Sequence, residues 1–255
     1  ACSGAKTDDF FKDREAGSTI KTISGDPDKL ATNKQIIKYL EDKDVCNIKP
    51  NNELKVSYAI TNSTIGSQRG ERQRRIGVRC NYTIRRQLDN VNTSTDMVMM
   101  TIGGNDLGFD NIIKSCFAAA LRSASDCQSK INEARGQFDK LENKLGSVLS
   151  SLNSRLRPDA KIVLLGYPLL ALNNNESLSG FPVAKEVRKL GLEGNSRQKK
   201  IVNAYNKSIG QEKVIFIDSL PQRFYGHEPD ASIFRKNHDR WIHEFFEPSA
   251  FNMNS

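Results

Sequence analysis

The residues best suited to chemistry in this 255-residue chain lie in one short turn, Gly103-Gly104-Asn105-Asp106. Two glycines let a backbone bend tightly and approach a ligand closely. Asn105 presents an amide N–H₂ group, a neutral donor suited to an oxygen that gains negative charge during acyl transfer. Asp106 can cap a following helix or anchor the turn. An ordinary surface turn has the same composition, so the elements around these residues must decide between the two interpretations.

The turn follows a continuous apolar run at residues 96–102, which is typical of a strand buried on both faces of a parallel sheet. Similar runs at 161–168 and 213–218 predict two more strands. Between the first two runs, apolar residues recur at spacings of 3 and 4: Ile131, Ala134, Phe138, Leu141, Leu145, Val148 and Leu152. This spacing predicts one long helix ending near Pro158. A coiled coil has the same spacing, but the strand that follows at once favours a helix laid on a sheet.

A polar segment at 173–195 precedes a predicted helix at 196–209. Strands and helices therefore alternate, which predicts an α/β fold with an open, mostly parallel sheet. Ligands of such sheets bind at the carboxyl ends of the strands. The ends of interest are the 103–106 turn and the residues around Tyr167 and Asp218.

The N-terminal part is harder to interpret. Residues 29–42 predict a helix with four apolar residues on one side: Leu30, Ile36, Ile37 and Leu40. Residues 43–83 are polar, apart from an alternating segment at 54–60 that predicts a short strand or hairpin arm. Seven arginines fall within 69–86: Arg69, Arg72, Arg74, Arg75, Arg79, Arg85 and Arg86. A solvated face is favoured over a nucleic-acid or anionic-membrane patch, because little aromatic interleaving accompanies them.

Composition narrows the class of protein. Hydrophobic residues make up 37% and charged residues 27%, which excludes a disordered tail. No stretch approaches the ~18 apolar residues of a transmembrane helix. No basic-then-apolar leader is present, and the chain opens directly on Ala1. The net charge of +8 permits an anionic partner without demanding one.

Five cysteines without a CxxC pair, and only three histidines, predict no structural zinc site. Five Asn-x-Ser/Thr sequons occur: Asn62, Asn81, Asn92, Asn175 and Asn206. They suggest glycosylation in a secretory pathway, although a composition rich in Asn and Ser would also produce them. Together with the cysteines, they favour a secreted glycoprotein with disulfides.

Three segments resemble a known family. Thr101-Ile102-Gly103-Gly104-Asn105-Asp106-Leu107-Gly108-Phe109 is similar to block III of the SGNH hydrolases, also called GDSL-type esterases and lipases. Ala1-Cys2-Ser3-Gly4-Ala5-Lys6-Thr7 resembles block II of the secreted lipase branch. Phe224-Tyr225-Gly226-His227-Glu228, followed by Arg240-Trp241-Ile242, resembles the stretch before the catalytic His of that branch. The order and rough spacing of the three segments fit over most of the chain.

The resemblance implies a three-layer α/β sandwich of the flavodoxin-like SGNH type and the hydrolysis of carboxylic esters. A serine would attack the carbonyl, a histidine would act as its base, and an aspartate would orient that histidine. The Gly4 backbone N–H and the Asn105 side chain would be two donors to the oxyanion, with Gly103 shaping the turn. Gly103, Gly104 and Tyr167 would contact an ester or lipid substrate. No metal or cofactor is implied.

The chain also departs from the family pattern. The nucleophile of the family lies in a Gly-Asp-Ser motif upstream of block II, whereas the one Gly-Asp here, Gly25-Asp26, precedes Pro27 and is interpreted as a surface turn. Ser3 is expected to be structural. His238 and His243 lie in a charged, apparently helical stretch and are expected to be exposed, and Glu247 offers a degenerate alternative base. We therefore expect the catalytic His beyond residue 255, with His243 as the candidate within the chain.

The resemblance also implies the cysteine pairing. Cys116 and Cys127 would form the local disulfide that the family has after block III. Cys2 would pair with a cysteine in a missing N-terminal region, which leaves Cys46 and Cys80 for each other. Their disulfide would staple an insertion at about 20–84 within a single domain spanning 1–255.

Three interpretations stay open. The chain is the central part of a secreted SGNH esterase or lipase and is inactive alone, because its nucleophile and base lie outside it. Alternatively, it is a non-catalytic SGNH-like protein that binds lipid, glycan or another anionic ligand. In the third interpretation, the chain is a basic binding module whose arginines at 69–86 bind anionic glycans or lipid headgroups. We expect a monomer that binds no nucleic acid, with peripheral contact to anionic surfaces possible in any of the three.

Overall fold

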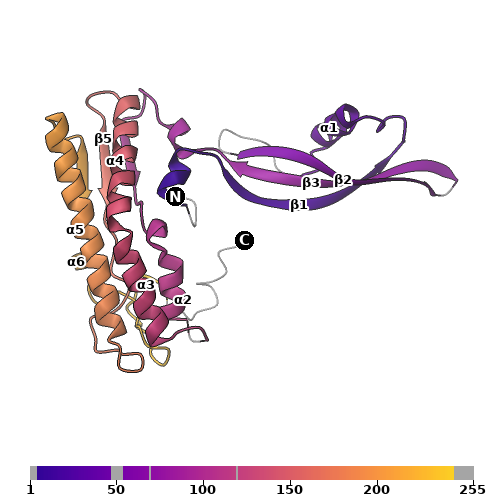
Figure 1. Cartoon of the computed structure of the whole chain (residues 1–255). Coiled ribbons are helices and arrows are strands. Elements are labelled where there is room, and N and C mark those ends of the chain that lie inside the picture. Colours follow the sequence, from indigo (N-terminus) through magenta and orange to yellow (C-terminus); the bar gives the residue numbers. More distant parts are fainter. Residues whose placement is uncertain (1–4, 47–53, 69, 119, 244–255) are drawn as a thin grey trace. The chain divides into compact units, whose positions relative to one another are not determined.

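A computed structural model of the chain describes residues 5–46, 54–68, 70–118 and 120–243. The chain divides into two compact units (Figure 1). We call residues 1–10 with 90–255 the α/β unit, and residues 11–89 the antiparallel unit. The first contains a three-stranded parallel sheet and the second a three-stranded antiparallel sheet, so the fold is mixed α/β.

Two further features of the described residues concern membranes and metals. None of their helices is both long enough and apolar enough to traverse a bilayer. Among the same residues, no three side chains of His, Cys, Asp or Glu gather as metal ligands would.

The parallel sheet consists of β4 (Met97–Met100), β5 (Lys161–Leu165) and β6 (Val214–Ile217), in that spatial order. All three predicted strands are therefore confirmed, with shorter bounds. The central strand β5 is the most deeply buried. The prediction that the first strand is buried on both faces is wrong, because Met97 is 53% and Met99 65% exposed. Both lie on β4, which is an edge strand of the described sheet.

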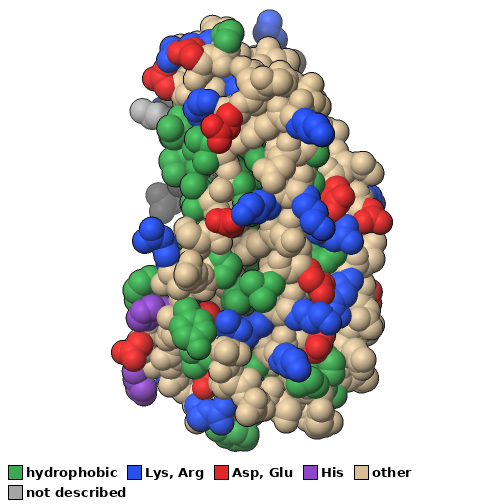
Figure 2. Space-filling model, turned by 90° about the vertical axis from the view of Figure 1, so that its left-hand side faces the viewer, with side chains coloured by type: hydrophobic (Ala, Val, Ile, Leu, Met, Phe, Trp, Pro, Cys, Tyr) green, Lys and Arg blue, Asp and Glu red, His purple; other side chains and the backbone are tan. Residues whose placement is uncertain are grey.

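Helices α3, α4 and α5 pack on one another beside this sheet, and α5 also packs on β6 (Figure 1). On the face of the molecule shown in Figure 2, basic and acidic side chains are interspersed. The helices of the unit are α2 (Phe109–Cys116), α3 (Ala124–Gly136), α4 (Phe138–Arg155), α5 (Val183–Ile209) and α6 (Leu220–Arg223). Short 3₁₀ turns are η1 (Thr7–Phe10), η2 (Gln87–Asn90) and η3 (Asn105–Leu107).

Two helices differ from the prediction. The single helix expected around 131–152 is two helices, α3 and α4, separated at Gln137 directly after Gly136, although all seven apolar residues are buried as expected. Helix α5 begins at Val183, within the polar segment at 173–195 and 13 residues before the predicted start at 196. Gly191 and Gly194 obscured it, since glycine costs about 1 kcal/mol in a helix. A Cβ on Gly191 would lie 2.9 Å from Leu169, so the glycine lets α5 approach that residue closely.

The antiparallel unit consists of β1 (Arg14–Gly25), β2 (Leu54–Gln68) and β3 (Glu71–Ile84), in the order β1-β3-β2, with helix α1 (Asn33–Asp42). Helix α1 starts at a capping box in which Thr32 and Gln35 exchange hydrogen bonds. It covers an apolar core of Ile23, Leu30, Ile36, Leu40, Ile76 and Val78. Ile37, expected on the same side, is 38% exposed.

The sequence analysis found only part of this sheet. It predicted a short strand at 54–60 and missed both β1 and β3. The missed signal in β3 is the alternation of Ile76, Val78, Cys80 and Tyr82, all buried, with Gly77, Arg79 and Asn81 between them. The arginines of the same segment masked that period-2 pattern.

Both predicted disulfides are confirmed. Cys46–Cys80 ties β3 to the segment after α1, and Cys116–Cys127 ties α2 to α3. Cys2 lies outside the described residues, as do Ser3 and Gly4.

Replacing both Cys116 and Cys127 by alanine should lower the free energy of unfolding by about 3 kcal/mol in the chain-entropy model. Trp241, the single tryptophan of the chain, reports on this unit in a urea titration. The double alanine variant of Cys46 and Cys80 is the matched control, because it loosens the other unit and should leave the Trp241 transition in place. A Trp241 transition that moves equally in both variants would contradict the assignment of one disulfide to each unit.

The sequon residue Asn206 is hydrogen-bonded within the fold through its side chain. The Asn206 amide nitrogen donates to the Val214 carbonyl (2.8 Å), and its oxygen accepts from the Lys213 and Val214 N–H groups. A glycan would replace one of the two hydrogens of this nitrogen. Asn175, by contrast, is exposed. Glycosylation of the chain stays a prediction.

Candidate functional site

The N-terminal segment meets the 103–106 turn, about 100 residues away in the sequence. The Asp106 carboxylate accepts hydrogen bonds from the Thr7 backbone N–H (2.8 Å) and hydroxyl (2.7 Å). Lys144 of α4 also donates to Asp106 (3.2 Å). The Asp106 side chain is 6% exposed and Thr7 is fully buried. Of the two roles considered for Asp106, it therefore anchors the turn, whereas α2 begins without a side-chain cap.

Asn105 is held by the same segment. Its Nδ2 donates to the Ala5 carbonyl oxygen at 2.8 Å. Gly4, the residue before Ala5, lies outside the described residues, so the predicted approach of Asn105 to Gly4 stays a prediction. A carboxamide nitrogen carries two hydrogens, and the bond to Ala5 uses one of them. The arrangement fixes the orientation of the amide, and among the described residues no hydrogen bond of its second N–H is found.

The turn requires its first glycine and connects two strand ends. Gly103 has a φ of +106°, and a Cβ there would lie 2.9 Å from Leu141 of α4. The Gly104 N–H donates to the Tyr167 hydroxyl at 3.2 Å. Burial raises the pKa of Tyr167, so its phenol stays protonated at neutral pH. The ends of β4 and β5 are thereby tied together.

Two amide side chains of α5, not anticipated from the sequence, hold the same strand ends. Asn195 forms two 2.8 Å hydrogen bonds with Tyr167, accepting from its N–H and donating to its carbonyl. Gln198, one turn later, donates to the Ile102 carbonyl at 2.9 Å. A Cβ on Gly166 would lie 2.9 Å from the Asn195 oxygen, so this glycine allows the contact. The available signal was a pair of amides spaced i, i+3, but Asn195 was placed in the polar segment at 173–195, before the predicted helix.

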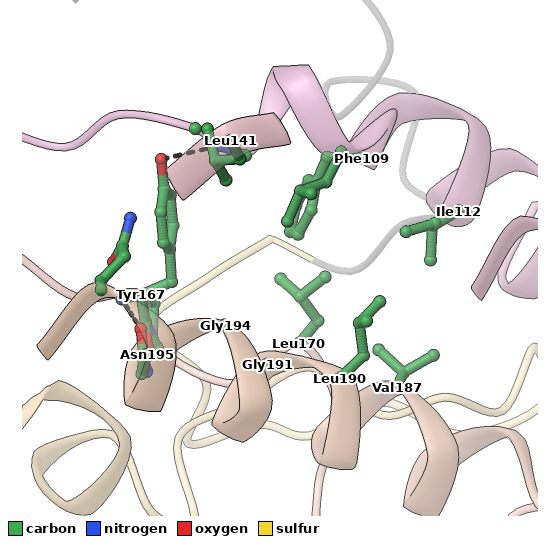
Figure 3. Close-up of a pocket in the computed structure, with 15 residues that line it drawn as sticks. Phe109, Ile112, Leu141, Tyr167, Leu170, Val187, Leu190, Gly191, Gly194 and Asn195 are labelled. Atoms are coloured by element: carbon green, nitrogen blue, oxygen red, sulfur yellow. Dashed lines mark hydrogen bonds between the residues drawn. The ribbon is translucent and has the colours of Figure 1, made fainter. Parts of the chain in front are cut away.

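An apolar pocket starts at this turn. Its cavity volume is about 60 Å³, and it is partly open to solvent. Phe109, Leu170 and Leu190 lie around a common space in Figure 3. The full lining is Gly103, Gly104, Leu107, Phe109, Ile112, Leu141, Tyr167, Pro168, Leu170, Val187, Leu190, Gly191, Gly194, Asn195 and Gln198.

The structure brings the three predicted substrate-contacting residues, Gly103, Gly104 and Tyr167, to this one pocket. Asn105 does not line it but follows Gly104 directly. The third strand end does not join them, since Asp218 is exposed and pairs with Lys199 (2.6 Å). Two of the three strand ends therefore form the site.

The two C-terminal segments that entered the resemblance come together. The His227 ring stacks on Trp241, with centroids 3.9 Å apart, and Phe224 meets Trp241 edge-on. Glu228 is fully buried and pairs with Arg188 at 2.8 Å. His227 therefore packs within this cluster, as expected for a residue outside the catalytic block.

His243, the candidate base, is exposed and is not among the residues that line the pocket. The helical stretch expected around His238 and His243 is wrong, because residues 231–243 form turns and bends. Short polar residues and the absence of an apolar period explain why no helix forms there. Glu247 lies outside the described residues.

Comparison with known proteins identifies distant relatives over part of the chain. No family profile matches it. A lipase of Streptomyces rimosus is 39% identical over 93 residues, and Lipase 1 of Streptomyces coelicolor is 36% identical over 93 residues. Each alignment covers 36% of this chain and 33% of the lipase, so the matched part is about a third of the length of these relatives.

Among solved structures, the extracellular lipase of Streptomyces rimosus aligns with a TM-score of 0.50 and 28% identity. That alignment covers 64% of this chain and 63% of the lipase chain. Over part of its length, the chain is thus a distant homologue of extracellular Streptomyces lipases.

Proposed function

We propose that this chain is the central part of a secreted serine esterase or lipase of the SGNH type, acting on esters with an apolar acyl group. The observation that carries the proposal is the apolar pocket that begins at Gly103 and Gly104, the two residues directly before Asn105. An ester bound with its acyl chain in the pocket would have its carbonyl near the turn. The homology to extracellular lipases supports the reaction class.

In the proposed mechanism, a serine outside residues 1–255 attacks the ester carbonyl and a histidine, also outside, takes its proton. The oxyanion that forms is stabilised by the N–H of Gly4 and by the second Nδ2 hydrogen of Asn105. The bond from Asn105 to Ala5 orients the amide before the substrate binds (2.8 Å). Such preorganisation stabilises the transition state without reorganisation during the reaction.

The position of β4 at the edge of the described sheet and the exposed side chains on one of its faces support a missing part of the fold. Met97 and Met99 of β4 are more than half exposed, which is unusual for apolar residues of a parallel strand. We propose that the strand carrying the Gly-Asp-Ser motif pairs with β4 in the parent protein and completes a three-layer sandwich. It would also place the nucleophile at the carboxyl end of the sheet, next to the 103–106 turn. The two disulfides and the extracellular homologue support secretion.

The pocket can be tested in the chain as it stands. Gly194→Leu would add a side chain at a position that lines the pocket, and the new Cβ would meet Phe138 at an ordinary 3.7 Å. It should weaken the binding of a fluorescent long-chain fatty acid at least ~10-fold, because several methylenes at ~0.8 kcal/mol each would lose their burial. The measurement is a fluorescence titration.

Gly146→Leu is the matched control. This glycine is also in a helix, α4, and a Cβ there meets nothing within 4 Å. Affinity should stay unchanged in this variant. Equal affinities for the wild type and Gly194→Leu would exclude the pocket as the acyl site.

The alternative is a non-catalytic relative that keeps the pocket and has lost the catalytic groups. It predicts the same fatty-acid binding. The two proposals differ in the gene for the full-length protein. A non-catalytic relative would lack both an upstream Gly-Asp-Ser and a downstream Asp-x-x-His.

A further inference from the structure

The residues that line the apolar pocket differ in burial. Leu107, Phe109 and Leu170 are only half-buried, whereas Ile112 is 1% and Val187 3% exposed. The half-buried residues therefore lie on the side of the pocket that opens to solvent. The buried residues form its floor, which is part of the apolar core of the α/β unit.

The pocket ends at Val187 of α5. Val183 and Ala184 precede Val187 by about one helical turn and are fully buried in the same apolar cluster, but neither of them lines the pocket. In Figure 3, Val187 lies on the opposite side of the pocket from Tyr167. An acyl chain that enters from the 103–106 turn would therefore meet Val187 and find the closely packed core behind it.

The size of the cavity limits what can be enclosed. Its volume is about 60 Å³. An apolar protein cavity of about 150 Å³ holds one benzene molecule, so each carbon atom needs roughly 25 Å³. The cavity at the turn therefore has room for about two or three carbon atoms. The rest of a longer chain would leave through the open side, where it stays in contact with water.

We propose that the pocket selects esters of short acyl chains, with about three carbons or fewer beyond the carbonyl, and that Val187 sets this limit. The inference rests on the proposed function, because it takes the pocket as the acyl site of an ester hydrolase. Each enclosed carbon contributes about fourfold to binding, equivalent to ~0.8 kcal/mol. Carbons that stay in water contribute far less, so the preference should rise with chain length and then stop rising.

The test is the kcat/KM of the parent protein for p-nitrophenyl esters from acetate to octanoate. The value should rise about fourfold per carbon from acetate through propionate to butyrate, because these carbons enter the cavity. From butyrate to octanoate it should change by less than about twofold, because the added carbons stay outside.

Variants of Val187 should move the limit in both directions. Val187→Ala removes two methyl groups from the floor, so hexanoate should become roughly 15-fold better than butyrate. Val187→Ile fills part of the cavity, so butyrate should lose its advantage over propionate. Val202→Ala is the matched control, because Val202 lies on the same helix and is 2% exposed but does not line the pocket. It should keep the limit at butyrate.

A kcat/KM that keeps rising to octanoate would overturn the short-chain limit and leave the proposed function standing. Equal shifts in Val187→Ala and Val202→Ala would overturn the role of Val187. A parent protein that hydrolyses none of the esters would contradict the proposed function instead. Displacement of a fluorescent fatty acid from the 255-residue chain by methyl esters then decides the limit: affinity that stops rising at methyl butyrate supports it, and a steady rise to methyl octanoate overturns it.

Discussion

The 255-residue chain should show no detectable hydrolysis of p-nitrophenyl esters. Loss of the nucleophile or base of a serine hydrolase leaves only binding and oxyanion stabilisation, a fall of about 10⁴–10⁶-fold in kcat. This chain contains the candidate oxyanion donor Asn105 and the apolar pocket, but we place the nucleophilic serine and the histidine base outside it. A longer protein that includes the upstream Gly-Asp-Ser and the downstream His should recover the full kcat that this chain lacks.

The control is the extended protein in which the serine of Gly-Asp-Ser is replaced by alanine. It should fall back to the rate of the shorter chain, although it keeps every element that the extension adds to the fold. Ester turnover by the 255-residue chain at the rate of the extended protein would show that the nucleophile lies within residues 1–255.

In the extended protein, Asn105→Ala should lower kcat by roughly 10²–10³-fold with a smaller change in KM, because one oxyanion donor contributes that much to acyl transfer. The effect should fall on kcat, since the oxyanion exists in the transition state and not in the bound ester. Initial rates across a range of ester concentrations separate the two constants.

Asn105→Ala also removes the hydrogen bond to Ala5, so a control for structure is needed. Asn111→Ala is suitable, because Asn111 is exposed on the neighbouring helix α2 and does not line the pocket. It should leave both constants unchanged. A loss confined to KM in Asn105→Ala would contradict the oxyanion role and favour a role in substrate binding.

The sheet and the local turn could be predicted from the sequence because both rest on short-range signals. Continuous apolar runs gave β4, β5 and β6 within two or three residues of their ends. Gly103 and Gly104 predicted a tight turn, and the positive φ of Gly103 meets that expectation. The disulfides followed from the family resemblance rather than from any local pattern.

The rest of the site depends on contacts between distant segments. The bonds from Asp106 to Thr7 and from Asn105 to Ala5 join residues about 100 apart, and no periodic pattern encodes them. Helix α5 was missed at its N-terminal half because Gly191 and Gly194 have poor helix propensity, although both are pocket residues. Gly191 and Gly194 therefore weakened the helix prediction, and because they have no side chain they also leave space in the pocket.

The exposure of β4 could not be predicted for a related reason. An apolar run predicts burial, and Met97 and Met99, which point to one face of β4, would be buried by a layer packed on that face in a more complete fold. The apolar pattern of a strand reflects its burial in the complete fold. The exposure of its side chains here reflects only the part of the fold that residues 1–255 provide. The difference between the two supports the proposed missing part of the fold.

Fluorophosphonate labelling of the parent protein, followed by peptide mapping, tests the proposed hydrolase most directly. The reagent reacts with an activated serine and not with ordinary hydroxyls, so it identifies the nucleophile without a choice of substrate. We predict a single labelled serine, in a Gly-Asp-Ser motif upstream of Ala1, and no label on the 255-residue chain under the same conditions. A parent protein that takes no label, or a label on a serine within residues 1–255, would contradict the account.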